Sequence, residues 1–265
     1  MTNYSHYMKT IARNEEILKK RISRFFKSSE AGRAELYSLI SSLRMAGDVI
    51  LFGGVLRDIA LYGTKKFNSD IDLVIDCSPQ SLSDLIKNKS ISATQNKFNG
   101  YRTEAGGWSI DFWPIESTWA FANNKVTLEG KKSLLNTTIT NWDSIIYSFK
   151  ENKIICSKNY FTDLQSGLLD IILEENPNQI GALIRILKSI YDKNARVITS
   201  KTAKYICDEL KKWTKEEIID WQVNQLQKVY FTESDIKELE EKLLHPQADL
   251  FGHEILKKGT NFSLL

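Results

Sequence analysis

Apolar residues recur at helical spacing over residues 1–47, and the spacing changes after that point. Apolar positions three and four residues apart predict two amphipathic helices, with a break at residues 28–32. From residue 49 the pattern shifts to short apolar runs typical of strands, interrupted by helical stretches. Helical spacing returns after residue 176 and continues to about residue 257. The chain is therefore expected to be an α+β protein with helices at both ends of a central mixed sheet.

The central part of the chain alternates apolar runs with glycines and a helical pattern. A run at residues 49–52 ends at Gly53-Gly54, and the helical pattern follows directly. Gly106-Gly107 separates two strand-like segments and predicts a hairpin turn. These features predict a small mixed sheet with helices on one side. The further strand-like segments are residues 71–75, 91–94, 100–103 and 108–115.

Two carboxylates stand one residue apart in the second apolar run. Because side chains alternate along a strand, Asp70 and Asp72 are expected on one face, roughly 6 to 7 Å apart. Such a pair repels and loses hydration unless cations sit between the two groups. Mg²⁺ prefers oxygen ligands of this kind, and a nucleoside triphosphate supplies the remaining ones. The Gly53-Gly54 turn precedes a helix start, where free amides hold phosphate. Together these residues predict nucleotidyl transfer.

These motifs resemble a known family. Residues 53–58 read Gly-Gly-Val-Leu-Arg-Asp, residues 62–63 read Tyr-Gly, and residues 70–72 read Asp-Ile-Asp. This order resembles the head domain of the DNA polymerase beta nucleotidyltransferase superfamily, above all bacterial CCA-adding enzymes and poly(A) polymerases. Their signature has Leu-Gly where this chain has Tyr-Gly. The resemblance covers residues 48 to 115 and implies a nucleotidyltransferase palm.

The resemblance implies roles for individual residues. It places two Mg²⁺ ions on Asp70, Asp72 and a third carboxylate on a neighbouring strand. Asp111, in a strand-like segment, is the candidate for this third catalytic and metal-binding residue, and Glu104 is a competitor. The residues assigned to nucleotide binding are Gly53, Gly54, Arg57, Asp58, Ser69, Arg185 and Lys188.

Several of these assignments have a structural alternative. Arg57 is placed to meet a phosphate, but it also suits an ion pair with Asp58. Asp58 near the positive end of a helix compensates the helix dipole equally well. Arg185 and Lys188 resemble basic residues of a family helix, yet a surface helix with two basic residues is common. The family also carries Asp-Phe-Thr-Ile-Asn-Ala after the palm, which residues 136–142 resemble without the leading Asp.

The length and the charge of the chain limit how many domains it can form and which kinds of partner suit it. The chain has 265 residues, and we divide it into N-terminal helices (1–47), a palm (48–135) and a mainly helical C-terminal domain (136–265). The net charge of +3 is small, but the N-terminal segment is clearly basic. Such a cluster suits an RNA backbone or the solvated face of a helix. Its basic residues are Lys9, Arg13, Lys19, Lys20, Arg21, Arg24, Lys27 and Arg33.

Cysteine and histidine usage excludes several classes of site. The three cysteines are far apart in sequence and lack metal-ligand spacing, which indicates a reducing compartment. The three histidines form no pattern for zinc or for Ser-His chemistry. No apolar stretch reaches the length of a membrane span, and the N-terminus is too polar for a secretory signal. A soluble, cytoplasmic protein is expected.

The acceptor of the nucleotide is the open question. The preferred hypothesis is transfer from a nucleoside triphosphate to an RNA 3′ end, because antibiotic-modifying nucleotidyltransferases commonly lack the Arg57-Asp58 pair. CCA-adding enzymes are longer, and no residues for templated C and A addition are identified. Transfer to a small molecule, or to a partner protein in a toxin–antitoxin or phage-defence setting, is the alternative. A catalytically silent module that binds nucleotide or RNA is the third hypothesis.

Overall fold

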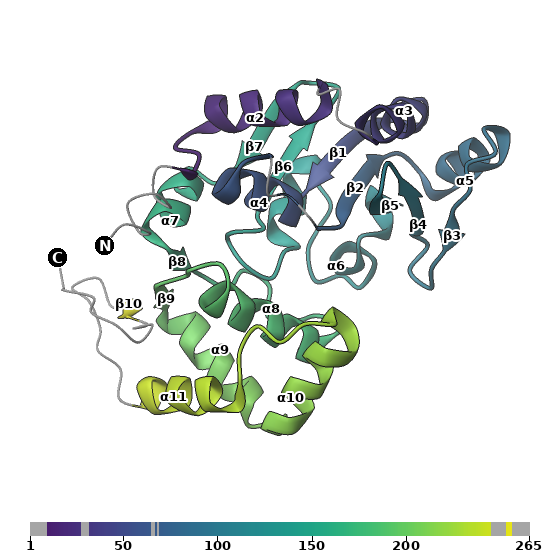
Figure 1. The fold of residues 1–265 in the computed structure, drawn as a ribbon. Helices are drawn as coiled ribbons and strands as arrows, with labels where there is room; N and C mark the ends of the chain where they lie inside the picture. Colours follow the sequence, from purple (N-terminus) through teal and green to yellow (C-terminus); the bar gives the residue numbers. More distant parts are fainter. Residues whose placement is uncertain (1–9, 28–31, 65–66, 68, 245–252, 256–265) are drawn as a thin grey trace. The chain divides into compact units, whose positions relative to one another are not determined.

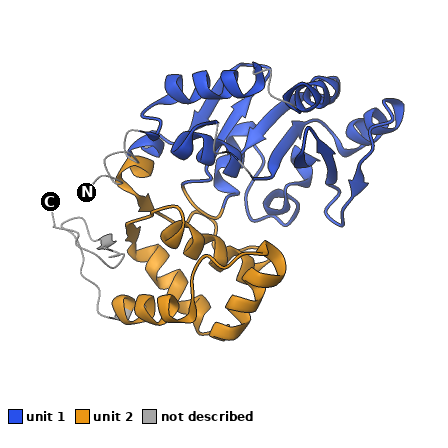
Figure 2. Ribbon diagram, in the orientation of Figure 1, with its two compact units in different colours: residues 1–138, 142–162 blue, residues 139–141, 163–265 orange. Residues whose placement is uncertain are grey.

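The chain folds into two compact units. Unit 1 comprises residues 1–138 and 142–162, and unit 2 comprises residues 139–141 and 163–265 (Figure 2). We describe each unit by itself. The computed structural model (Figure 1) describes residues 10–27, 32–64, 67, 69–244 and 253–255.

A seven-stranded mixed sheet forms the centre of unit 1, in the order β3-β4-β5-β2-β1-β6-β7. β2 and β5 are parallel, and the other neighbouring strands are antiparallel. The α+β class with a mixed sheet, expected from the apolar pattern, is confirmed. The strands are β1 (Asp48–Phe52), β2 (Ile71–Asp76), β3 (Thr94–Gln95), β4 (Tyr101–Ala105), β5 (Trp108–Pro114), β6 (Ile145–Ser148) and β7 (Lys153–Cys156).

Helices cover both faces of this sheet, whereas the sequence predicted helices on one side. α2 (Glu15–Lys27), α3 (Arg33–Leu43) and α4 (Gly54–Tyr62) form one layer, in which α2 contacts both of the others and α4 contacts β1, β2 and β6 (Figure 1). A second core lies on the other face, where short helices pack over Ile50, Val74 and Ile146. The remaining helices of unit 1 are α5 (Pro79–Asn88), η2 (Ile115–Ser117), α6 (Trp119–Ala122) and η3 (Lys131–Asn136).

Two basic residues of the N-terminal segment hold the helical layer together. Arg21 donates to the carbonyl oxygens of Ile59 (3.0 Å) and Ala60 (2.8 Å), near the end of α4. These carbonyls carry the negative end of the helix dipole, so a guanidinium stabilises them. Arg33 is buried, donates to the carbonyl oxygen of Phe25 (3.1 Å) and lies 4.6 Å from the centre of its ring. Arg21 and Arg33 therefore serve the fold. Lys9, in the same basic segment, lies outside the described residues.

The hairpin between β4 and β5 docks on the start of α3. Its turn is at Gly106-Gly107, as predicted, and both residues have positive φ angles. A Cβ on Gly106 would lie 1.9 Å from the carbonyl oxygen of Gly32, so only glycine fits there. The amide of Gly106 donates to the carboxylate of Glu35 at 2.9 Å. These contacts fix the hairpin that carries one side of the candidate site.

β6 and β7 complete the sheet of unit 1, although the division by sequence placed them in the C-terminal domain. β6 pairs with β1 through Leu51 opposite Tyr147, and β7 pairs with β6 at the edge of the sheet. The physical reason is that β6 gains its backbone partners from β1, and β7 gains its own from β6, so both apolar runs are paired only within this sheet. Unit 1 therefore extends to residue 162, with residues 139–141 belonging to unit 2.

Unit 2 is mainly helical and also contains a three-stranded sheet in the order β10-β9-β8, which the sequence did not predict. Local caps set helix starts: Asn178 accepts from the amide of Gly181, and Thr214 forms a capping box with Glu217. Its elements after α7 (Tyr160–Ser166) are β8 (Leu168–Leu169), α8 (Gln179–Tyr191), β9 (Val197–Thr199), α9 (Ser200–Leu210), α10 (Lys215–Trp221), η4 (Gln222–Leu226, a π-helix), α11 (Glu233–Leu244) and β10 (His253–Ile255). Pro246, expected to end the last helix, lies outside the described residues.

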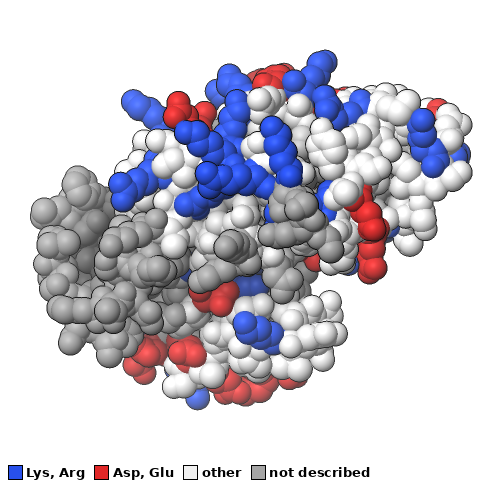
Figure 3. Space-filling view, turned by 45° about the horizontal axis from the view of Figure 1, so that its top comes forward, with Lys and Arg blue, Asp and Glu red and all other residues white. Residues whose placement is uncertain are grey.

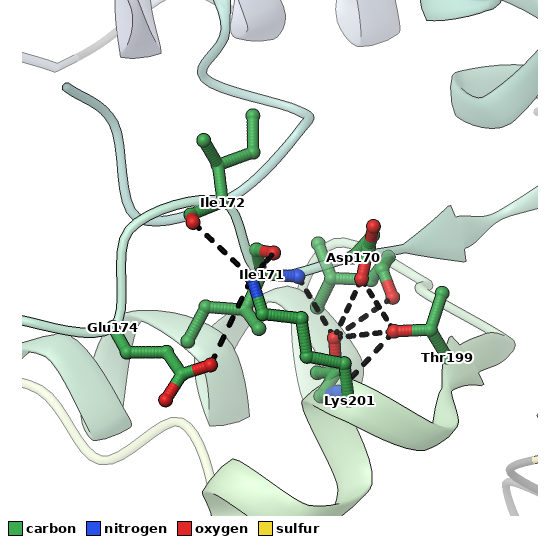
Figure 4. Close-up of polar contacts among 8 residues, drawn as sticks. Asp170, Ile171, Ile172, Glu174, Thr199 and Lys201 are labelled. Carbon is green, nitrogen blue, oxygen red and sulfur yellow. Dashed lines mark hydrogen bonds and ion pairs between the residues drawn. The ribbon is translucent and has the colours of Figure 1, made fainter. Parts of the chain in front are cut away.

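The first turn of α9 fastens the segment that follows β8 (Figure 4). Lys201 donates to the carbonyl oxygens of Ile171 (3.0 Å) and Ile172 (3.2 Å) and lies 3.8 Å from a carboxylate oxygen of Glu174. The hydroxyl of Thr199 donates to the carboxylate of Asp170. These side chains are engaged within unit 2 and serve its fold. In the described ranges, no helix combines the length and the apolar character needed to cross a bilayer.

Candidate functional site

A glycine turn connects β1 to α4. Gly53 has a φ of 62°, which favours glycine, and its amide donates to the carbonyl oxygen of Ile145 in β6 at 3.0 Å. α4 begins at Gly54. The first amides of a helix, here those of Gly54 and Val55, have no acceptor within the helix and point toward its positive end. This is the local geometry that binds phosphate groups.

Two carboxylates face each other across neighbouring strands beside this turn. Asp72 in β2 lies opposite Asp111 in the parallel strand β5, and adjacent strands are about 4.8 Å apart. Leu51 of β1 lies opposite Leu73, so continuing the antiparallel register places the end of β1 and the glycine turn next to Asp72. The turn and both carboxylates therefore lie at one edge of the sheet.

The register favours Asp111 over Glu104 as the third carboxylate. Glu104 is exposed on β4 and lies opposite Ser109, two residues away from the row that contains Asp72. Asp111 is partly buried on β5, and its neighbours Ile110 and Phe112 point into the core on the opposite face. That Asp111 binds a metal stays a prediction.

Asp70 lies outside the strand in which it was expected. β2 begins at Ile71, which pairs with Ile110, and the Asp70 side chain is 61% exposed. Only the side chains of residues within a paired strand alternate strictly between the two faces of the sheet. Because Asp70 lies outside β2, strand pairing does not fix its side chain on the same face as that of Asp72. Among the described residues, no three His, Cys, Asp or Glu side chains gather closely enough to hold a metal ion. The donor set, carboxylate oxygens only, still matches the chemistry that Mg²⁺ prefers.

An arginine supplies a positive charge beside Asp72 and Asp111, in the row of residues that pair across β2, β5 and β4. Arg102 of β4 lies opposite Asp111, and its guanidinium donates to both carboxylate oxygens of Asp111, at 2.8 Å through Nε. Its Nη2 lies 3.7 Å from a carboxylate oxygen of Asp70. The hydrogen bond to Asp111, together with the charges of Asp111, Asp70 and Asp72, raises the pKa of Arg102 despite partial burial. The positive charge of Arg102 therefore offsets the negative charges of Asp111, Asp70 and Asp72.

A second cluster of charged residues, around Arg57, lies next to the glycine turn. Arg57 donates through Nε to Asp58 at 2.8 Å and through Nη1 to Asp143, and its side chain is 13% exposed. Burial alone would lower the pKa of Arg57, but the charges of Asp143 and Asp58 and the bond to Asp58 raise it. Ser69 donates to Asp58 at 3.3 Å, which ties the segment before β2 to α4. Arg57 and Ser69 thus both contact Asp58, and the roles of these three residues in nucleotide binding stay predictions.

Asp143 is a site residue that the sequence motifs did not identify. It lies two residues before β6, and its backbone carbonyl oxygen lies 3.5 Å from where a Cβ of Gly53 would be. The resemblance to the family motif covers residues 136–142 and 144–147, lacks the leading Asp and passes over Asp143. The available signal was an acidic residue two positions before the apolar run at residues 145–147. The partner, Arg57, lies 86 residues earlier, and no local pattern connects the two.

The two basic residues predicted on a later helix belong to unit 2. Arg185 and Lys188 lie on α8, and Arg185 is exposed. The ammonium group of Lys188 lies 3.9 Å from the ring centre of Tyr230, a cation–π contact within the unit. A part in nucleotide binding stays a prediction for both.

Comparison with known proteins places this arrangement among solved folds. No protein-family model and no curated protein matches the chain. Among solved structures, a tRNA-processing enzyme in an apo form superposes with a TM-score of 0.57 at 17% identity, over 85% of this chain and 62% of that one. A tRNA nucleotidyltransferase complexed with a primer tRNA and an incoming ATP analog gives 0.54 at 18%, over 78% and 60%. A CCA-adding enzyme with ATP gives 0.52 at 14%, over 81% and 55%.

The chain spans between 55% and 62% of the length of these three proteins. At this identity the likeness concerns the fold. It extends the resemblance first seen in the motifs of residues 53–72 to most of the chain. The chain therefore shares the fold of these tRNA-processing and CCA-adding enzymes over the part of them that it spans.

Proposed function

We propose that this chain transfers a nucleoside monophosphate from a nucleoside triphosphate to a hydroxyl group at an RNA 3′ end. The observation that carries the proposal is the register that sets Asp72 opposite Asp111 beside the Gly53 turn. One edge of the sheet thus combines a phosphate-binding helix start with paired carboxylates. Those are the two requirements of phosphoryl chemistry that works by positioning and charge neutralisation.

The roles follow from position. The amides of Gly54 and Val55 bind phosphate oxygens at the start of α4. Arg57 is a positioning residue, since a Cβ on Gly54 would lie 3.4 Å from its guanidinium and Asp143 holds it in place. Divalent cations, held by Asp70, Asp72 and Asp111, would neutralise the triphosphate and lower the pKa of the acceptor hydroxyl.

An RNA acceptor is supported by the fold and by surface charge. One of the similar structures contains a primer tRNA. Lys and Arg side chains gather on the face of unit 1 that carries α2 (Figure 3). α2 packs in the helical layer, whereas Asp72 shares its face of the sheet with Val74 and the second core. We therefore expect α2 to contact the RNA backbone at a distance from the reacting 3′ end. The exposed basic residues of α2 are Lys19, Lys20, Arg24 and Lys27.

A labelling experiment tests the proposal. The purified chain is incubated with Mg²⁺, total RNA and either ATP or CTP labelled at the α-phosphate. We expect label in RNA, and a decrease of at least about a thousandfold in rate for Asp72→Asn or Asp111→Asn because charge neutralisation at the reacting phosphate is removed. Full activity of Asp72→Asn would contradict the site assignment.

The distribution of label also tests the acceptor. Label on protein or on a small molecule from a cell extract would contradict RNA as the acceptor and leave nucleotidyl transfer standing. Replacing Lys19, Lys20 and Arg24 with Glu should raise the KM for RNA and leave the KM for nucleotide unchanged. Removing one ion pair between a basic side chain and an RNA phosphate should lower the salt slope of RNA binding by about one. Arg21 is left out of this variant because it closes the end of α4.

A further inference from the structure

One guanidinium faces three carboxylates in the candidate site. Arg102 donates to both oxygens of Asp111, lies 3.7 Å from Asp70 and is held by the charge of Asp72 as well. The three strands β2, β5 and β4 present Asp72, Asp111 and Arg102 as one row of Cα partners. This placement is fixed by the sheet and does not depend on a flexible loop.

The arginine and a divalent cation compete for the same atoms. A guanidinium bound to both oxygens of Asp111 occupies one lone pair on each, the pair of positions that a metal ion chelated by this carboxylate would also use. The positive charges also repel each other, so both cannot hold Asp111 at full strength. A cation that binds Asp111 must therefore displace Arg102 or weaken its bonds.

Displacement costs little, because the pair is at the surface. The Arg102 side chain is 58% exposed and that of Asp111 is 25% exposed. Because water can solvate both separated charges, an ion pair of this exposure adds little to stability, and a bound divalent cation can replace it. The partner residues stay in place, since Asp72 and Asp111 are anchored in paired strands.

We propose that Arg102 is an internal counter-ion, which balances Asp70, Asp72 and Asp111 in the cation-free protein and leaves Asp111 when a divalent cation binds. Arg102 thereby sets the cation concentration at which the site fills. The inference rests on the proposed function for the identity of the ligand, a divalent cation. It assigns to Arg102 a role that the carboxylates alone do not have.

Direct binding of Mn²⁺ tests this role without any assay of transfer. Mn²⁺ binding is measured by electron paramagnetic resonance and by calorimetry on the wild type, Arg102→Gln, Arg102→Lys and Asp111→Asn. We expect Arg102→Gln to bind Mn²⁺ roughly tenfold more tightly, because a repelling charge and a competitor are removed. Arg102→Lys keeps the charge without the paired bonds and should fall between the two. Arg24→Gln, an exposed arginine on α2, should bind Mn²⁺ like the wild type.

A spectroscopic signal reports on the arginine itself. The Nε–H resonance of ¹⁵N-labelled Arg102 should shift when Mg²⁺ is added, because its bond to Asp111 breaks, and should sit at the shifted position in Asp111→Asn without metal. An unchanged or weakened Mn²⁺ affinity in Arg102→Gln would overturn the inference. A resonance that stays unshifted at saturating Mg²⁺ would overturn it as well.

The outcomes separate this inference from the proposed function. Tighter Mn²⁺ binding by Arg102→Gln in a protein that transfers no nucleotide supports the counter-ion role and contradicts the proposed function. Nucleotide transfer to RNA with equal Mn²⁺ affinity in wild type and Arg102→Gln supports the proposed function and contradicts the counter-ion role.

Discussion

Two arginines in unit 1 each face more than one carboxylate, yet their surroundings give them different roles. Arg57 pairs with Asp58 and Asp143 and is 13% exposed, whereas Arg102 pairs with Asp111 and is 58% exposed. In both cases one guanidinium lies beside two or more carboxylates. The difference in solvent contact decides whether the arginine can leave its partners.

Burial makes the Arg57 cluster a permanent connection. Removing one partner of a buried ion pair leaves the other charge without compensation, which is costly in a poorly hydrated site. The cluster joins the start of α4 to the segment before β6, and so it holds the glycine turn. At the surface, water replaces a missing partner, and the ion pair around Arg102 can open. The same pairing thus fixes the phosphate-binding turn and leaves the carboxylate row exchangeable.

The largest effect is expected from breaking the buried cluster. Arg57→Ala should lower the free energy of unfolding by about 3 kcal/mol, because Asp58 and Asp143 are left facing each other. Urea denaturation followed by circular dichroism measures this decrease. Arg102→Ala is the matched control and should be destabilised by less than about 1 kcal/mol. Equal destabilisation of the two variants would remove the distinction between them.

A smaller effect is expected at the end of α4. Arg21→Ala should lower the free energy of unfolding by about 1 to 2 kcal/mol, since the carbonyls of Ile59 and Ala60 no longer have a charged donor. Arg24→Ala on the exposed side of α2 should leave it unchanged within about 0.5 kcal/mol. The same urea titration compares both. A decrease for Arg24→Ala as large as that for Arg21→Ala would contradict the assignment of Arg21 to the fold.

Local patterns were enough to predict much of unit 1. The change from helical to strand spacing at residue 49 predicted the sheet, and Gly106-Gly107 predicted its hairpin. The end of a ladder is not a local property: β2 begins at Ile71 because β5 offers Ile110 as its partner there, which leaves Asp70 outside. β6 and β7 were not assigned to this sheet for a similar reason, since a short apolar run does not reveal its partner strand.

The candidate site divides in the same way. Gly53, Gly54 and Asp72 belong to motifs that lie close together in sequence, and those motifs predicted them as site residues. Arg102 and Asp143 become part of the site only through pairing across strands and through a contact 86 residues apart. The sequence alone presents each of them as an ordinary charged residue.

Coupling between Asp72 and Arg102 provides a finer test of the exposed row. In the wild type without metal, Asp72→Asn removes both repulsion from Asp111 and attraction to Arg102, so stability should change little. In the Arg102→Gln background only repulsion remains, and Asp72→Asn should stabilise the protein. A double-mutant cycle in EDTA should give a coupling of about 0.5 to 1 kcal/mol. Strict additivity would mean that Arg102 does not balance Asp72.

The smallest effect is expected just after the other end of β2, where burial and two nearby carboxylates raise the pKa of a thiol. Burial, followed by the charges of Asp76 and Glu116, raises the pKa of Cys77 from 9.0 to about 11. The unfolded chain therefore loses its thiol proton first, so stability present below pH 9 falls as the pH rises toward 11. The thiol is half-buried, and solvent screening keeps this contribution below the others. Cys77→Ala should reduce the fall in Tm between pH 8.5 and 10.5, and an identical fall in both proteins would contradict the raised pKa. Arg102→Gln changes a residue of β4 that lies near the beginning of β2, far along the strand from Cys77, and should leave this pH dependence unchanged.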